Sequence, residues 1–123
     1  MPKISKESIP TVHDFPQAQD RSGDIDGYTV NFVTIKETHD LVQMLAGLPD
    51  GKCACPHWGY MLKGRITVRY GDRADEVFEA GDAFYMPPGH VPGAEAGSEF
   101  LQFSPAREMA ETMAAIMKTM QAS

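Results

Sequence analysis

Two cysteines and a histidine stand close together in the stretch Cys53-Ala-Cys55-Pro-His57. Thiolates and imidazoles are the ligands that zinc, copper and other soft or borderline metals prefer. In an extended segment, residues i, i+2 and i+4 project from one face, and Cys53, Cys55 and His57 have that spacing. Pro56 favours this geometry, because a proline biases the residue before it toward an extended conformation. The stretch therefore predicts three metal ligands that converge on one ion.

A fourth donor has to come from elsewhere in the chain, and His90 is the candidate. A site made of Cys53, Cys55, His57 and His90 would hold a divalent ion, with zinc as the first expectation and copper or iron as alternatives. The competing interpretation is a pair of buried free cysteines and a hydrogen-bonded histidine. A disulfide between Cys53 and Cys55 would close a strained ring across one residue, so we expect thiols.

The elements that would position these residues are short strands with turn residues between them. The clearest strand is Arg65 to Tyr70, where Ile66, Val68 and Tyr70 alternate with polar residues and are expected to face inward. Short strands at close, regular spacing are typical of an all-β sandwich or barrel. The strands are expected over these ranges: 27–38, 60–63, 65–70, 76–79, 83–86 and 99–103.

The two ends of the chain differ from this pattern. Residues 1–26 are polar and rich in turn residues, so we expect an extended N-terminal arm that packs over the domain. Ser104-Pro105 has the composition of a helix start, with serine as the capping residue, and predicts a C-terminal α-helix over about 105–121. Met109, Met113 and further apolar residues form one stripe on that helix, expected to pack on the barrel or on a second copy of the chain.

Three local features are harder to assign. Residues 41–48 carry leucines at helical spacing but are short, and we expect a strand with an irregular end. The prolines and glycines of 87–97 predict a long loop. Trp58 and Tyr60 flank His57 and are expected in the core or in a pocket wall.

The composition limits the function classes. The chain has 123 residues, a length that predicts one domain over 1–123, and a net charge of −6 without a lysine or arginine cluster, so nucleic acid is not an expected partner. No window approaches the 18 apolar residues of a membrane span, and the first residues lack the apolar region of a signal peptide. A cytoplasmic location is the resulting expectation. Open barrel edges and the methionine stripe predict a homodimer.

The stretches 51–64 and 81–90 resemble the two conserved motifs of the cupin family, which are small double-stranded β-helix barrels, or jelly rolls. In the first motif a His-x-His pair and a glutamate precede a closing glycine. Gly64 is that glycine here, and His57 stands at the glutamate position, Cys53 at the second histidine and Gly51 at the first. The second motif is similar in full register at Gly81, Pro87 and Gly89, although Pro92 stands where its histidine would be.

The resemblance implies an all-β, cupin-like double-stranded β-helix barrel over about 27–104. Family members with three histidines and a glutamate hold iron, manganese or another divalent metal and include dioxygenases and isomerases. This chain lacks that set, so it is either metal-free or has a rebuilt site of Cys53, Cys55, His57 and His90. We therefore expect a small metal-binding cupin that takes a small molecule in the barrel. The sequence leaves open whether this protein is an enzyme. The alternative is a non-catalytic module that binds or senses a small ligand without a metal.

Overall fold

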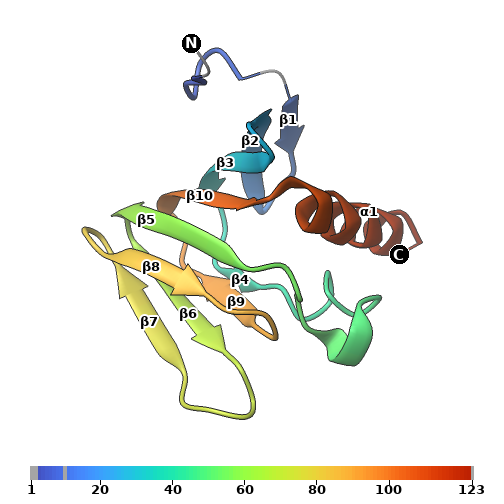
Figure 1. Cartoon of the computed structure of the whole chain (residues 1–123). Coiled ribbons are helices and arrows are strands. Elements are labelled where there is room, and N and C mark those ends of the chain that lie inside the picture. The colour runs from blue at the N-terminus through green and yellow to red at the C-terminus, as the bar shows by residue number, and fades with distance from the viewer. Residues whose placement is uncertain (1–2, 10, 123) are drawn as a thin grey trace.

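The computed structural model describes residues 3–9 and 11–122, so the parts of the expected arm and domain at 1–2, 10 and 123 lie outside it. Strands arranged in two antiparallel sheets precede a single C-terminal helix, α1 (Ala106–Ala122) (Figure 1). The larger sheet has the order β1-β2-β3-β10-β5-β8 and the smaller one β4-β9-β6-β7. The strands are β1 Thr11–Asp14, β2 Ala18–Ile25, β3 Tyr28–Ile35, β4 His39–Asp40, β5 His57–Lys63, β6 Arg65–Arg69, β7 Glu76–Glu79, β8 Ala83–Met86, β9 Val91–Ala94 and β10 Glu99–Pro105.

The core lies between the two sheets and confirms the expected all-β barrel. Ile66 and Val68 of β6 are fully buried and pack with Met61 of β5 and Phe84 of β8 from the other sheet. Tyr70, which follows β6, is also buried, so the whole alternating pattern of 65–70 faces as predicted. Apolar side chains of both inner faces thus form one hydrophobic core, whose burial is the main stabilising term of such a fold.

Most of the expected N-terminal arm, from residue 11 onward, is instead part of the larger sheet, whereas residues 3–9 form no strand. β1 and β2 form a hairpin, and β2 pairs with β3 along its whole length. The turn between β2 and β3 contains Asp26 and Gly27, both with positive φ (47° and 83°). An aspartate-glycine pair with positive φ at both residues is the preferred two-residue hairpin turn. The two strands were not predicted because residues 11–25 are mostly polar. The Asp26-Gly27 pair is the sequence signal that would have indicated a hairpin here.

Two other expectations are wrong. Residues 41–48 form turns and not a strand: the Leu45 N–H donates to the Leu41 carbonyl at 2.9 Å, a single helical turn that ends before Pro49. Eight residues, with Gly47 near their end and Pro49 directly after them, are too few to propagate a helix. The expected loop 87–97 contains β9, which pairs with both β4 and β6 despite Pro92 and Gly93.

α1 covers one end of the barrel, next to the segment between β4 and β5 (Figure 1). Met109 packs there with Leu45, Cys53 and Cys55, and Met113 lies against the same cluster. The stripe of the predicted helix therefore packs on the barrel. The helix begins at Ala106, because Pro105 still belongs to β10, and no helix among the described residues is both long and apolar enough to cross a membrane.

Gly64→Ala is expected to destabilise the fold far more than Gly81→Ala. Both glycines have positive φ (78° and 94°), which costs an alanine about 1–2 kcal/mol. A Cβ at Gly64 would also lie 2.2 Å from Oγ and 2.6 Å from Cα of Ser98, whereas a Cβ at Gly81 would meet nothing within 4 Å. We expect a loss of about 3 kcal/mol or more at Gly64, read from urea unfolding. Equal losses in the two variants would contradict the close approach of Ser98 to Gly64.

Candidate metal centre

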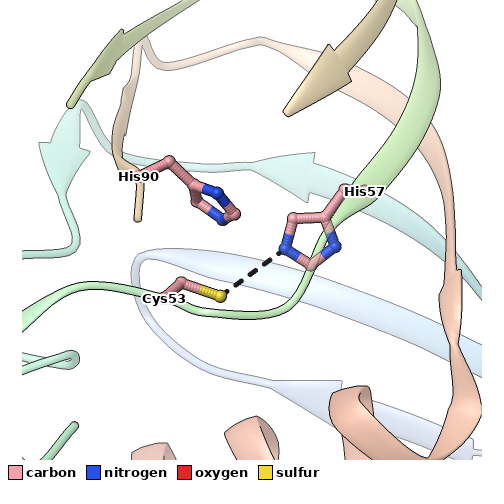
Figure 2. A group of neighbouring side chains, drawn as sticks. All are labelled: Cys53, His57 and His90. Atoms are coloured by element: carbon pink, nitrogen blue, oxygen red, sulfur yellow. Dashed lines mark hydrogen bonds between the residues drawn. The ribbon is translucent and has the colours of Figure 1, made fainter. Parts of the chain in front are cut away.

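Three potential metal ligands from two separate segments meet inside the barrel. Cys53 and His90 form an isolated β-bridge, in which the Cys53 N–H donates to the His90 carbonyl at 3.0 Å, and His57 is the first residue of β5. One ligand atom from each side chain lies within 4.8 Å of the other two. Figure 2 shows the three side chains pointing toward one another. The segments that resemble the two cupin motifs are thus joined at this point.

The three side chains are buried, with 4%, 6% and 1% of Cys53, His57 and His90 exposed. The Cys53 thiol faces Nε2 of His57 at 3.7 Å, and the two imidazole rings lie 4.9 Å apart between centroids. Zinc–sulfur and zinc–nitrogen bonds are about 2.3 and 2.0–2.1 Å long, so ligand atoms of one tetrahedral ion stand about 3.5 Å apart. The 3.7 Å distance is close to this value, whereas the 4.8 Å limit for the whole group is longer, so the side chains have to move together to share one ion.

Hydrogen bonds on the far side of each ring fix the two histidines. Nδ1 of His90 donates to the Pro87 carbonyl at 2.6 Å, which leaves Nε2 of that ring as the free electron pair. Nδ1 of His57 lies 2.6 Å from the hydroxyl of Ser104, and Nε2 faces Cys53. Metal-binding histidines are held in this way by a second hydrogen bond that sets tautomer and ring orientation. The arrangement therefore presents Nε2 of both rings toward the thiol.

Burial sets the protonation state of all three groups. Burial, with the neighbouring His90 second, lowers the pKa of His57 from 6.5 to about 3, and burial also lowers the pKa of His90. Burial raises the pKa of the Cys53 thiol above its ordinary value. At neutral pH the imidazoles are uncharged, which is the state that binds metals, and the thiol must give up its proton when an ion binds.

Acid is expected to destabilise the metal-free protein through His57. The unfolded chain takes up the proton near pH 6.5 and the folded chain only near pH 3, so stability rises with pH across this window and falls on acidification. Between pH 7 and pH 4 we expect His57 to account for a loss of about 3 kcal/mol. Urea unfolding with a chelator present, for wild type and His57→Gln at both pH values, measures it. If both proteins lose the same free energy over this range, His57 is not buried in its neutral form.

Cys55 stands outside the group. Its side chain is fully buried, packs with Leu45 and Met109, and its thiol donates weakly to the Pro56 carbonyl at 3.6 Å. The strict alternation expected from Cys53 to His57 does not hold, because residues 53–56 precede β5 and bend at Cys55. The structure thus brings together three of the four expected ligands.

Other neighbours of the site were not identified from the sequence. Ser104, expected as a helix cap, is the hydrogen-bond partner of His57 from the end of β10. Trp58 and Tyr60, expected in the core or pocket wall, are instead 43% and 44% exposed, because His57 and Met61 take the inward positions of β5. Side chains alternate between the two faces of a strand. If His57 had been taken as an inward residue, this alternation would have predicted that Trp58 and Tyr60 point outward.

The donor group lies in the wall of a cavity of about 170 Å³. Cys53, His57 and His90 share this wall with side chains of the inner barrel and of α1, among them Phe100 and Met109. The wall is largely apolar, as is usual for pockets that take small molecules. The helix that covers the end of the barrel therefore also lines the cavity next to the donor group.

Comparisons with known proteins identify the fold. No protein-family model matches the sequence, and no curated protein matches it either. Solved structures do match. An RmlC-like cupin from Shewanella frigidimarina shares 20% identity, with 85% of this chain and 91% of that one covered and a TM-score of 0.61. KdgF from a Halomonas species shares 23% identity, with coverages of 83% and 90% and a TM-score of 0.55.

A third match is the S161A mutant of oxalate decarboxylase from Bacillus subtilis, at 18% identity and a TM-score of 0.58. The alignment covers 77% of this chain but only 27% of that one, so this chain corresponds to one part of the larger enzyme. Similarity at this level of identity carries information on the fold. Together with the two antiparallel sheets and the core between them, these matches show that the chain has the cupin fold.

Proposed function

We propose that this chain is a single-domain, metal-binding protein that holds one divalent ion in the barrel through Cys53, His57 and His90. The observation that supports the proposal is the convergence of three buried donor atoms within 4.8 Å. Among the described residues the group includes no fourth histidine, cysteine or carboxylate. Three protein ligands leave one position open, as in catalytic zinc sites, whereas structural sites close all four.

The donor types restrict the metal. One thiolate and two imidazoles suit zinc, and they also suit copper. Iron and manganese sites usually include carboxylates, and the group holds none. Zinc and copper are therefore the ions that this site fits best, and iron fits less well.

A small molecule in the cavity would lie beside the ion, because all three ligands line the cavity wall. A bound zinc ion can polarise a carbonyl group or activate a water molecule. The chain's own residues would exclude bulk water through α1 and hold the two imidazoles in position through Ser104 and Pro87. The apolar wall also supports the alternative function, in which the cavity binds or senses a small ligand without a metal.

Metal content tests the proposal. The protein is purified without a histidine tag and without added metal, and its metals are measured by mass spectrometry before and after dialysis against zinc. We expect close to one ion per chain after dialysis, and the same ion to be lost when Cys53 is replaced. Less than a tenth of an ion per chain in both preparations would favour the metal-free alternative.

The thiol that the site needs fits the proposed cytoplasmic location, where cysteines stay reduced. Both cysteines are free in the structure.

We also propose that the chain is a homodimer, through a surface different from the expected methionine stripe. That surface is the aromatic face, the outward side of the larger sheet around Trp58, and its exposed apolar side chains are Tyr28, Trp58, Tyr60, Leu62, Tyr85 and Phe103.

A further inference from the structure

Thioether groups are concentrated around the donor group. The chain has 8 methionines. The cavity that contains Cys53, His57 and His90 is lined by Met44, Met86, Met109, Met113 and Met120. Methionine is a polarizable side chain that fills irregular apolar space, so its presence alone indicates nothing about metals. The positions of two of them relative to the donors are more informative.

Met86 and Met109 lie near the donor group on two different elements, Met86 on β8 and Met109 on α1. Met86 is the direct cross-strand neighbour of His57 in the pairing of β5 with β8, so the two side chains share the inner face of the sheet. Met109, on α1, packs in the same buried cluster as Cys53. Both methionines are almost completely buried and line the cavity. One methionine is thus the cross-strand neighbour of an imidazole donor, and the other packs in the cluster that contains the thiol.

No free carboxylate competes for the ion among the described residues of the cavity wall. The carboxylate in the cavity wall belongs to Asp20, and it is engaged by the side chain of Asn31 at 2.9 and 3.1 Å. It is not a member of the donor group. The environment of the three donors therefore combines thiol, imidazole and thioether with the neutral oxygens of Gln102 and Thr112, and it offers no free carboxylate.

Thiolates and thioethers are the protein ligands that select cuprous copper, whereas zinc is bound by thiolate, imidazole and carboxylate and gains little from a thioether. We infer that the donor group of Cys53, His57 and His90 is a cuprous copper site, completed by the sulfur of Met86 or Met109. This inference rests on the proposed function and names the ion that the site selects. Copper bound here would be shielded from solvent by α1 and by the apolar cavity wall.

The test compares the affinities for two probe ions in the same set of variants. Cu(I) affinity is measured anaerobically against a coloured Cu(I) chelator, and zinc affinity against a fluorescent zinc indicator. Met86→Leu and Met109→Leu remove each thioether with little change in volume, and the double variant removes both. Met61→Leu is the matched control, because Met61 is fully buried on the same sheet face but does not line the cavity.

We expect the double variant to lose Cu(I) affinity by about tenfold or more, the scale on which groups around a metal site contribute, with zinc affinity and the Met61→Leu protein unchanged. Equal losses for both ions, or no loss for Cu(I) while zinc still binds through Cys53, would overturn the copper inference and leave the proposed metal site intact. If the wild type binds neither ion, the proposed function itself fails. Circular dichroism of each variant checks that the fold is retained.

Discussion

Replacing Cys53 by serine is expected to lower metal affinity by a factor on the order of 10²–10³. Structural zinc sites with four ligands bind with about 10–16 kcal/mol, so a single ligand accounts for roughly 2.5–4 kcal/mol. Cys53 is the ligand with the largest expected share, because it supplies the only negative charge of the donor group once its proton is lost. Competition with a fluorescent zinc indicator at pH 7.5 measures the change directly.

Cys55→Ser is the matched control for that experiment. Both thiols are buried and two residues apart, but only Cys53 belongs to the donor group. We expect zinc affinity in Cys55→Ser within a factor of about three of the wild type, with a stability loss of roughly 1 kcal/mol from the buried hydroxyl. His57→Gln and His90→Gln should each lower zinc affinity as well, by a smaller factor than Cys53→Ser. If Cys55→Ser loses as much affinity as Cys53→Ser, the ligand set of three is wrong.

The second large effect is expected for Trp58→Glu on self-association. Trp58 lies at the centre of the aromatic face, opposite Phe103 of β10 on one side and Tyr85 of β8 on the other. Its ring stacks at a tilt on Tyr85, with 5.0 Å between centroids. Buried tryptophans at interfaces contribute about 2–4 kcal/mol, and a two-fold interface contains each residue twice. We expect the dissociation constant of the dimer to rise by about 10³-fold or more.

Sedimentation velocity at micromolar concentration separates the outcomes. The wild type should sediment as a dimer and Trp58→Glu as a monomer. Val77→Glu serves as the control, because Val77 of β7 is 49% exposed, similar to the 43% of Trp58, but lies on the smaller sheet. A wild type that is monomeric throughout, or a Trp58→Glu protein that remains a dimer, would contradict the proposed interface.

Most of the fold could be predicted from the sequence, because the strands of a barrel have an alternating pattern and turn residues that are visible in short stretches of the chain. The alternation of 65–70 and the turn residues around Gly64 and Gly81 depend on neighbours along the chain, and the structure has the expected strands there. The spacing from Gly81 to Gly89 carries the resemblance to the cupin motif. These features predicted the architecture without knowledge of which strands pair.

The parts that were wrong depend on contacts between distant segments. β9 contains Pro92 and Gly93, residues rare within strands, and exists because β6 and β4 pair with it from both sides. The polar strand β2 is likewise stabilised by its pairing with β3. Composition reflects average preferences, and tertiary pairing overrides them in both cases.

The candidate site was predictable in its residue types but not in its geometry. Cys53 and His57 were identified from their spacing, and His90 because it lies near the histidine position of the second motif, which Pro92 occupies. Cys55 packs in the cluster with Leu45 because the chain bends before β5. No residue pattern in the sequence predicted this bend. The role of Ser104 required knowledge that β10 runs beside β5 and ends next to His57.

The most direct test of the proposed centre is X-ray absorption at the edge of the bound metal, because it counts ligand atoms by element and distance. For the zinc-loaded protein the structure predicts one sulfur near 2.3 Å and two imidazole nitrogens near 2.0–2.1 Å, with any remaining ligand a light atom from water or buffer. A second sulfur ligand would mean that Cys55 or a methionine of the cavity wall also binds zinc, and the ligand set of three would be wrong. A shell of nitrogen and oxygen alone would contradict the account, since it would exclude the Cys53 thiolate from the metal.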